Sequence, residues 1–195
     1  VEFRNFRHVS GDPDSLAGNG ISSLLIDRQG RLWAAGLDAG LNLLDATTGK
    51  FDHWKHDPAN PGSLVSEKVW ALAQTADGSL WVGTRFGLDR MRADGSFEHV
   101  VNPLLGPAPA DFGEVAALYV DPRQRLWVGS AHGIFRRDAD GSWHQVLPAD
   151  PAQTVDAWRI DGNGEEVRIA TVRGLLVVGP DGRAHRVARD ALPDT

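Results

Sequence analysis

The sequence contains no cysteine, and this absence excludes several classes of site. Without a cysteine among its 195 residues, the chain has no disulfide framework, no thiolate zinc site and no thiol nucleophile. Basic residues are also in deficit, because 20 Lys and Arg against 26 Asp and Glu give a formal net charge of −6. Such a chain carries no electrostatic footprint for nucleic acid or anionic lipid, so we expect neither as a partner.

Long apolar runs and helical periodicity are missing too. No run approaches the roughly 18–20 residues of a membrane span, so we expect no direct membrane insertion by this segment. Apolar residues nowhere recur at positions i, i+3, i+4 and i+7 over a dozen residues, which excludes a helical fold. The chain is instead rich in turn formers, with 22 Gly and 11 Pro, and has 7 Trp against 1 Tyr.

A short motif that contains tryptophan recurs along the chain. Residues 32–36 (LWAAG), 80–84 (LWVGT) and 126–130 (LWVGS) are three versions of it. Residues 167–171 (VRIAT) are a fourth version, in which Arg168 occupies the tryptophan position. Successive copies are separated by 48, 46 and 41 residues. Periods of this length are typical of the blades of a β-propeller.

A second set of residues repeats with an offset of 48 and supports the same period. It comprises an aromatic pair, a histidine and a Pro-x-Ser-Leu motif: Phe3, Phe6, His8, Pro13, Ser15 and Leu16 correspond to Phe51, Trp54, His56, Pro61, Ser63 and Leu64.

Each period contains four short apolar runs. In the second repeat these are residues 69–74, 79–84, 87–92 and 97–101. Asp-Gly turns lie between the first and second runs and between the third and fourth, and Asp-Gly is the strongest short-range signal of a β-hairpin. We therefore predict an all-β fold of about four four-stranded antiparallel propeller blades that form a partial propeller.

The repeats divide the chain into five parts. Residues 1–20 are predicted to be the outer strand (1–9) and linker of a neighbouring blade, and the four blades are predicted at residues 21–68, 69–114, 115–154 and 155–195, with residues 183–188 as the last outer strand. An open blade edge is an aggregation hazard, so a partner must cover it. Further blades of the same protein or a second copy of the chain would do so; a four-bladed ring is the alternative.

These residues resemble the two-component-regulator propeller repeat. The resemblance is best in the second repeat, in the run Asp77-Gly78-x-Leu80-Trp81-Val82-Gly83-Thr84. It is weaker in the third, where Gln124 replaces the turn glycine, and weakest in the fourth, where Arg168 replaces tryptophan. The family implies the periplasmic sensor region of a hybrid histidine kinase or a diguanylate cyclase. Such a region would not itself be catalytic and would need no cofactor.

Propeller geometry narrows the search for a ligand site to one face of the disc. The Asp-Gly turns open on one face, and the variable connections open on the other, where recognition residues usually lie. The candidate ligand-binding residues on that second face are Asn19, Asp38, Glu67, Lys68, Arg85, Glu114, His132 and Arg173. Their mixed charge suits a small polar ligand, such as a carbohydrate.

Other functions of the repeated residues are less favoured. The three tryptophans could stack against sugars, but repetition at one strand position favours packing between blades. The Asp-Gly clusters lack the dense ligand array of a calcium loop, and the histidines lack zinc-site spacing, so we expect no metal. A propeller lyase of the streptogramin-inactivating type would need His132 beside Glu114 or Glu67. A non-catalytic protein-interaction scaffold is the third reading.

Overall fold

The computed structural model describes residues 4–106, 111–148, 157–164, 166–172 and 174–186. The described residues form β-strands and no helix, and the strands form four antiparallel sheets. Sheet 1 contains β1 (Ile21–Ile26), β2 (Leu32–Gly36), β3 (Leu41–Leu44) and β4 (Phe51–Trp54). Sheet 2 contains β5 (Val69–Gln74), β6 (Leu80–Thr84), β7 (Gly87–Met91) and β8 (Phe97–His99). Sheet 3 contains β9 (Val115–Val120), β10 (Leu126–Ser130), β11 (Gly133–Arg137) and β12 (Trp143–Pro148). Sheet 4 contains β13 (Ala157–Gly162), β14 (Val167–Thr171), β15 (Gly174–Val178) and β16 (Ala184–Arg186).

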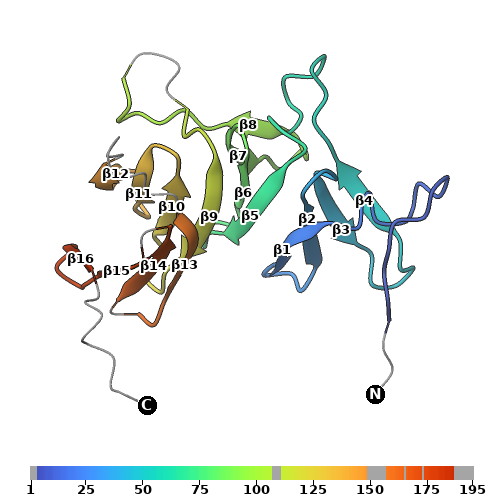
Figure 1. Cartoon of the computed structure of the whole chain (residues 1–195). Helices are drawn as coiled ribbons and strands as arrows, with labels where there is room; N and C mark the ends of the chain where they lie inside the picture. Colours follow the sequence, from blue (N-terminus) through green and yellow to red (C-terminus); the bar gives the residue numbers. More distant parts are fainter. Residues whose placement is uncertain (1–3, 107–110, 149–156, 165, 173, 187–195) are drawn as a thin grey trace.

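The four sheets stand side by side in an open arc (Figure 1). Each is a simple meander in which neighbouring strands are consecutive in sequence. The first strands β1, β5, β9 and β13 line the inner side of the arc, and the fourth strands lie on its outer side (Figure 1). The ring is not closed, so the predicted all-β, partial-propeller fold is confirmed. The described residues contain no helix long and apolar enough to cross a membrane.

The strand predictions are confirmed for the second repeat, whereas the described N-terminal residues form no strand. All four predicted runs of sheet 2 form strands, with ends that shift by at most two residues. Residues 1–9 are predicted as an outer strand of a neighbouring blade; their described part, residues 4–9, forms no strand with the sheets of this chain, and the prediction for a neighbouring blade stays a prediction. A β-strand needs a neighbouring strand to accept and donate backbone hydrogen bonds. Residues 4–9 pair with no strand of the described chain, although the Phe6 ring packs edge-on against Phe51 of β4.

The N-terminal segment nevertheless keeps the local geometry of its repeat. His8 Nδ1 donates to the carbonyl oxygen of Leu16 at 2.8 Å, and His56 Nδ1 donates to that of Leu64 at 2.7 Å. The loop between is closed by a serine hydroxyl in both copies, Ser15 in one and Ser63 in the other. Residues 4–16 therefore repeat the connection that leads from sheet 1 into sheet 2.

The hairpin turns explain the Asp-Gly pattern. Glycines in these turns, such as Gly30, Gly78 and Gly95, have φ between 77° and 83°, a region that costs other residues about 1–2 kcal/mol. Gln124 occupies the same position in sheet 3 and has φ of 62°, the one positive φ of a non-glycine residue in the described chain. The replacement of the turn glycine by Gln124 therefore leaves this turn strained.

Each junction between sheets is built around one tryptophan. We call the face of a sheet that contacts the following sheet its leading face, and the opposite one its trailing face. Trp33, Trp81 and Trp127 lie on leading faces and are buried against the trailing faces of sheets 2, 3 and 4. The packing interpretation of the repeated tryptophan is confirmed.

A small residue beside each tryptophan lets the sheets approach. A Cβ added to Gly129 would lie 2.6 Å from the Cβ of Ala157 on the next sheet, and one added to Gly83 would lie 2.7 Å from the carbonyl oxygen of Val115. In the Trp-x-Gly motif, the tryptophan therefore fills the junction between two sheets, and the glycine lets the backbones of these sheets approach closely.

A polar anchor fixes each indole. Trp33 Nε1 donates to Asp27 and Trp127 Nε1 donates to Asp121, both at 2.9 Å, and an arginine donates to each carboxylate. Burial disfavours the charged form of Asp121, but hydrogen bonds from Trp127 and Arg125 outweigh it and lower the pKa of the carboxyl group. The pKa of Asp27 is lowered against burial in the same way. In sheet 2 the neutral Thr75 is the acceptor.

The strained turn gives a first prediction. Gln124→Gly should raise the free energy of unfolding by about 0.5–1 kcal/mol, because glycine adopts positive φ without steric cost. Gln124 Oε1 also accepts a hydrogen bond from Arg28 at 3.3 Å. Gln124→Ala, which loses that bond and keeps the Cβ, is therefore the matched control and should give no gain. Urea unfolding measures both, and equal effects of the two substitutions would contradict the strain.

The anchor gives a second prediction, on pH. Asp121 has a lowered pKa in the folded chain, so its stabilisation is complete above the ordinary carboxyl pKa and is lost as pH falls through the folded value. Asp121→Asn should lower stability at pH 7 by roughly 1–3 kcal/mol. It should also reduce the loss of stability between about pH 4 and pH 2. Urea unfolding at several pH values measures this, with exposed Glu98→Gln as control; an unchanged acid slope would contradict it.

Candidate functional site

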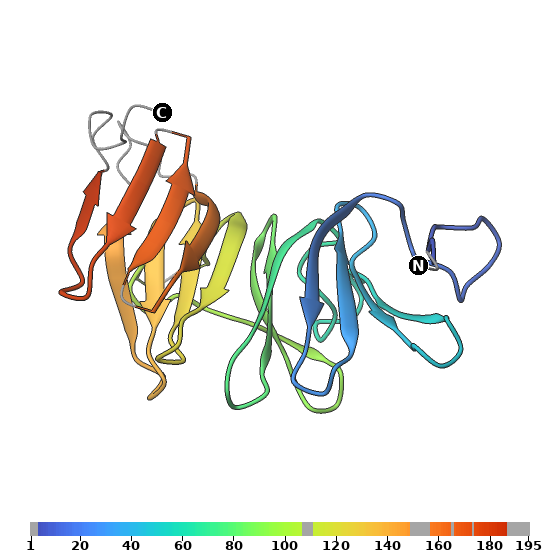
Figure 2. The ribbon, with the colours of Figure 1, turned by 90° about the horizontal axis from the view of Figure 1, so that it is seen from below.

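The connections predicted to carry the ligand residues lie at the end of the sheets opposite the Asp-Gly turns. Because strands in a meander alternate in direction, the β2–β3 turn and the β4–β5 connection share one end of the sheets, and the β1–β2 turn lies at the other (Figure 2). The variable connections and the Asp-Gly turns thus lie on opposite faces of the arc, as the sequence predicts.

Two of the candidate residues pair across the junction of sheets 1 and 2. Lys68 Nζ lies 3.3 Å from Asp38 Oδ1; the Asp38 side chain is largely exposed and that of Lys68 is partly exposed. Glu67 is exposed nearby, and its carbonyl oxygen accepts a hydrogen bond from the backbone of Gly40. Asn19 is used locally, since its Oδ1 accepts the backbone N–H of His8 at 2.8 Å.

The other candidates are spread over sheets 2 and 3. The Arg85 guanidinium lies 5.5 Å from the ring centre of its neighbour Phe86, which is exposed. His132 Nδ1 donates to the carbonyl oxygen of Asp111 at 3.1 Å. Glu114 is exposed at the start of β9 and lines a pocket. Arg173 lies outside the described residues. The structure thus brings Asp38 and Lys68 together and gives Glu114 a pocket.

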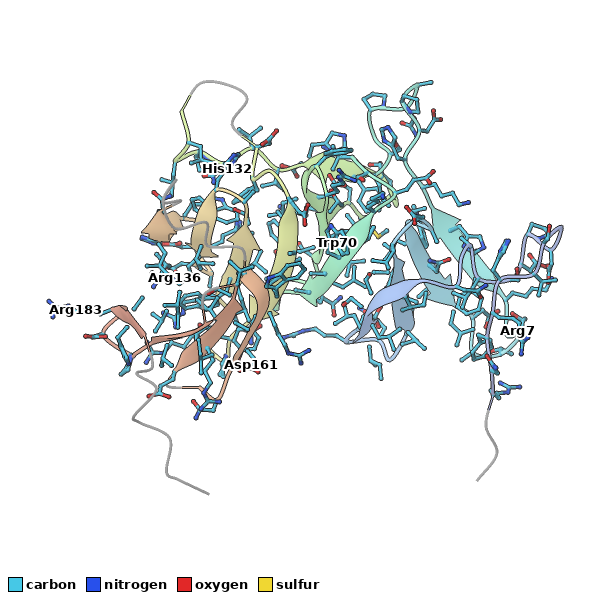
Figure 3. All side chains as sticks on the ribbon, in the orientation of Figure 1. Arg7, Trp70, His132, Arg136, Asp161 and Arg183 are labelled. Carbon is cyan, nitrogen blue, oxygen red and sulfur yellow. The ribbon has the colours of Figure 1, made fainter. Side chains whose placement is uncertain are left out.

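A groove of about 830 Å³ runs along the inner side of the arc. All four inner strands contribute to it, and its lining includes Trp70, Tyr119, Trp158, Arg159 and Asp161. Figure 3 shows Trp70 and Asp161 on this inner side, whereas Arg7 and Arg183 lie toward its two outer ends. A concave surface with aromatic rings and a few charged groups is the usual form of a small-molecule site.

The tryptophans of the groove occupy a bulge at the start of the inner strands. Register shifts place Ser22, Trp70, Ala116 and Trp158 at equivalent positions in sheets 1 to 4. Trp158 is 63% exposed. The indole nitrogen of Trp70 is buried and has no hydrogen-bond partner among the described residues.

Ala116 leaves a second, smaller pocket between sheets 3 and 4. Its volume is about 190 Å³, and it is lined by Glu114, Ala116, Gly129, Ser130, Ala131, Ala157 and Trp158. The small side chain stands where Trp70 stands in the sheet before. One candidate carboxylate, Glu114, and one exposed aromatic ring, Trp158, therefore border the same space.

The charges at the far end of the groove belong to sheet 4. Arg159 and Asp161 are exposed on β13. Tyr119 donates its hydroxyl hydrogen to the carbonyl oxygen of Gly162 at 3.2 Å. Burial and the negative charges of Asp121 and Asp161 raise the pKa of Tyr119, so its hydroxyl stays protonated at neutral pH.

Reasoning from the sequence missed Trp70, Trp158, Arg159 and Asp161 as groove residues. The predicted site residues lie on the variable connections, whereas these four residues lie within the repeated strands. The sequence does contain a signal for them, because the residue at the bulge position alternates between a small residue and tryptophan. This alternation can be recognised only when the position of the bulge in each inner strand is known.

Two repeats of the chain match a known family. The model described as two-component regulator propeller matches residues 15–38 and 63–86. These segments lead into and include the first two strands of sheets 1 and 2, and the second contains the motif on which the resemblance rests. The expected family is confirmed for these repeats. No curated protein sequence matches the chain at a significant level.

Solved structures share the fold at low sequence identity. An extracellular domain assigned to a one-component system of Bacteroides thetaiotaomicron is 21% identical over 95% of this chain and 24% of its own, with a TM-score of 0.72. PorZ, a surface component of the type-IX secretion system of Porphyromonas gingivalis, is 18% identical over 95% of this chain and 30% of its own (TM-score 0.68).

A virginiamycin B lyase from Staphylococcus aureus is 15% identical over 96% of this chain and 60% of its own, with a TM-score of 0.64. The chain thus spans between a quarter and three-fifths of these proteins. At this identity the likeness shows the fold alone.

The bulge position gives a prediction about the smaller pocket. Ala116→Trp should fill it and change the free energy of unfolding by less than about 1 kcal/mol, because the chain already carries Trp70 at the equivalent place. The next residue, Ala117, is buried in the junction with sheet 4. Ala117→Trp should therefore cost about 3 kcal/mol or more. Chemical unfolding compares the two variants, and equal costs would contradict the pocket.

Proposed function

We propose that this chain, which carries two-component regulator propeller repeats, is the periplasmic ligand-sensing region of a bacterial membrane signal-transduction protein. The output domain would be a histidine kinase of the hybrid type or a diguanylate cyclase. Support comes from the match of two repeats to the family and from the likeness of the fold to extracellular domains of signalling systems.

The site that best suits a ligand is the pocket where Trp158 and Glu114 meet the inner groove. Trp158 exposes 63% of its surface, far more than a ring used only for packing. A flat aromatic ring beside a carboxylate suits a small polar ligand such as a carbohydrate, because the ring covers the apolar face of a sugar and the carboxylate accepts its hydroxyl hydrogens. This exposed ring beside the pocket is the observation that carries the proposal.

The candidate residues of the variable face would then have unequal roles. Glu114 would contact the ligand directly. Lys68 lies two residues before Trp70, as Glu114 lies two before Ala116, so it stands at the equivalent point on the neighbouring inner strand. The ion pair between Lys68 and Asp38 would position the rim at that end.

We propose no catalytic role for this segment. The lyase alternative requires His132 to act with Glu114 or Glu67. In the described chain the Nδ1 of His132 is bonded to the backbone of Asp111 and not to either carboxylate. Catalysis is therefore assigned to an output domain, with this region as its regulator.

Binding can be tested with named sugars. We expect one or more of glucose, galactose, glucuronate, N-acetylglucosamine and xylo-oligosaccharides to raise the unfolding temperature and change tryptophan emission at millimolar concentration. Trp158→Ala and Glu114→Gln should each weaken that binding by about tenfold, equivalent to about 1.4 kcal/mol. Glu98→Gln, on an outer strand, is the matched control and should leave it unchanged.

Two outcomes would contradict the site. One is binding that survives both Trp158→Ala and Glu114→Gln. The other is a complete absence of any response across the sugars in a chain that is folded by circular dichroism.

The membrane context has a separate test. The open reading frame that encodes this chain should also encode an export signal, a membrane span and a kinase or cyclase domain. A stop codon directly after Thr195 would overturn the signalling assignment and leave sugar binding unaffected, so the two parts of the proposal can fail independently.

A further inference from the structure

The two open ends of the arc differ in chemistry. Sheets 1 and 4 each have one face that no sheet of the described residues covers: the trailing face of sheet 1 and the leading face of sheet 4 (Figures 1 and 2). Because the four sheets are repeats, every residue of an open face can be compared with its equivalents at the three junctions inside the chain.

The trailing face of sheet 1 is apolar and exposed. Ile21 is 37% exposed, whereas its equivalents Val69, Val115 and Ala157 are 0%, 0% and 2% exposed. Leu24 is 63% exposed, whereas its equivalent Leu72 is 7% exposed under sheet 1. This face therefore has the residues of an internal junction and lacks its cover.

The leading face of sheet 4 breaks the repeat with charges. Its cross-strand pair is Asp161 opposite Arg168, where the pairs in sheets 1, 2 and 3 are Leu25 with Trp33, Ala73 with Trp81, and Tyr119 with Trp127. One step along β13, Arg159 takes the place of Ser23, Ala71 and Ala117.

The leading face of sheet 4 keeps one apolar residue of the repeat. Leu175 is the equivalent of Leu41, Leu88 and Ile134; it is 41% exposed, and they are buried. The charges are thus set into a face that is otherwise shaped like the other three.

These charges act against joining the two ends. If the leading face of sheet 4 met the trailing face of sheet 1, Arg159, Asp161 and Arg168 would leave water and face Leu24 and Ile26. Ionised groups buried without full hydrogen bonding carry a large desolvation penalty. The penalty is the same for ring closure within one chain and for head-to-tail contact between two copies.

We propose that the trailing face of sheet 1 docks a further four-stranded sheet that presents an aliphatic–tryptophan pair like those of sheets 1 and 2, and that Arg159, Asp161 and Arg168 bar sheet 4 from that role. The N-terminal segment supports this occupant. Residues 4–16 repeat the connection between sheets, and Leu16 packs on the edge of the same face with Ala34 and Phe51, as Leu64 packs in the next junction. The chain thus enters sheet 1 as it would from such a sheet.

A grafted repeat tests the occupant. Residues 3–16 are equivalent to residues 51–64, so a copy of residues 21–50 fused directly before Phe3 completes one more sheet. We expect the extended chain to unfold at a higher temperature and to bind less of the dye ANS, because Ile21, Leu24 and Ile26 become covered. The matched control carries the same graft with its copies of Leu25 and Trp33 replaced by Asp and Arg, and should show neither change. A graft that behaves like its control would overturn the proposal.

A second experiment tests the charges. The unmodified chain should be monomeric in sedimentation analysis. The triple variant Arg159→Ala, Asp161→Leu and Arg168→Trp restores the repeat on sheet 4 and should associate head to tail, and adding Leu24→Glu should return it to a monomer. Circular dichroism confirms that each variant is folded.

Two results of that experiment would overturn the proposal. One is a folded triple variant that stays monomeric. The other is an unmodified chain that associates and is dissociated by Leu24→Glu, because a second copy would then be the occupant of the apolar face.

Discussion

The contact of one indole with the next sheet is the constraint on which the rest of the arc depends. A four-stranded sheet of this size has two apolar faces and cannot bury either alone. Trp81, for example, fills the junction with sheet 3 while its N–H is held by Thr75 of its own hairpin. Gly83 two residues on lets the next inner strand approach. The large residue, the small residue and the anchored indole N–H therefore act together. Each copy of the motif builds one junction between sheets.

That constraint explains how much of the fold could be predicted from the sequence. A junction needs the same residue types at the same strand positions, so the period and the strands of the second repeat could be derived from the residues alone. The turn at Gln124 was visible for the same reason, as a departure from glycine where positive φ is required. Residues 4–9, predicted as part of the outer strand of a neighbouring blade, form no strand in this chain. These residues have the right pattern, but strand formation also depends on a hydrogen-bonding neighbour, which the pattern cannot supply.

The candidate site was harder to predict for a related reason. The variable connections include the candidate Glu114, which directly precedes β9 and lines the smaller pocket. They do not include Trp158, which lies inside a repeated strand at a bulge, where a register shift turns one residue away from the regular pattern. Arg159 and Asp161 escape prediction for the same reason, because they lie within a strand whose repeat indicates a structural role. On a repeat scaffold, the positions that break the pattern within strands carry as much information as the loops.

Binding at Trp158 would not by itself make the chain a sensor. Trp158, which lines the proposed ligand pocket, lies on the same inner strand, β13, as Arg159 and Asp161 of the open face of sheet 4. A ligand shifts the arrangement at that face only by the difference between its affinities for the covered and the open state. Linkage makes the effect reciprocal, since whatever covers the face must change ligand affinity by the same factor. Suppose that a sugar binds the isolated arc and the form in which sheet 4 is covered with equal affinity. The sugar would then bind without changing the proportion of the two forms, so no signal would be passed on.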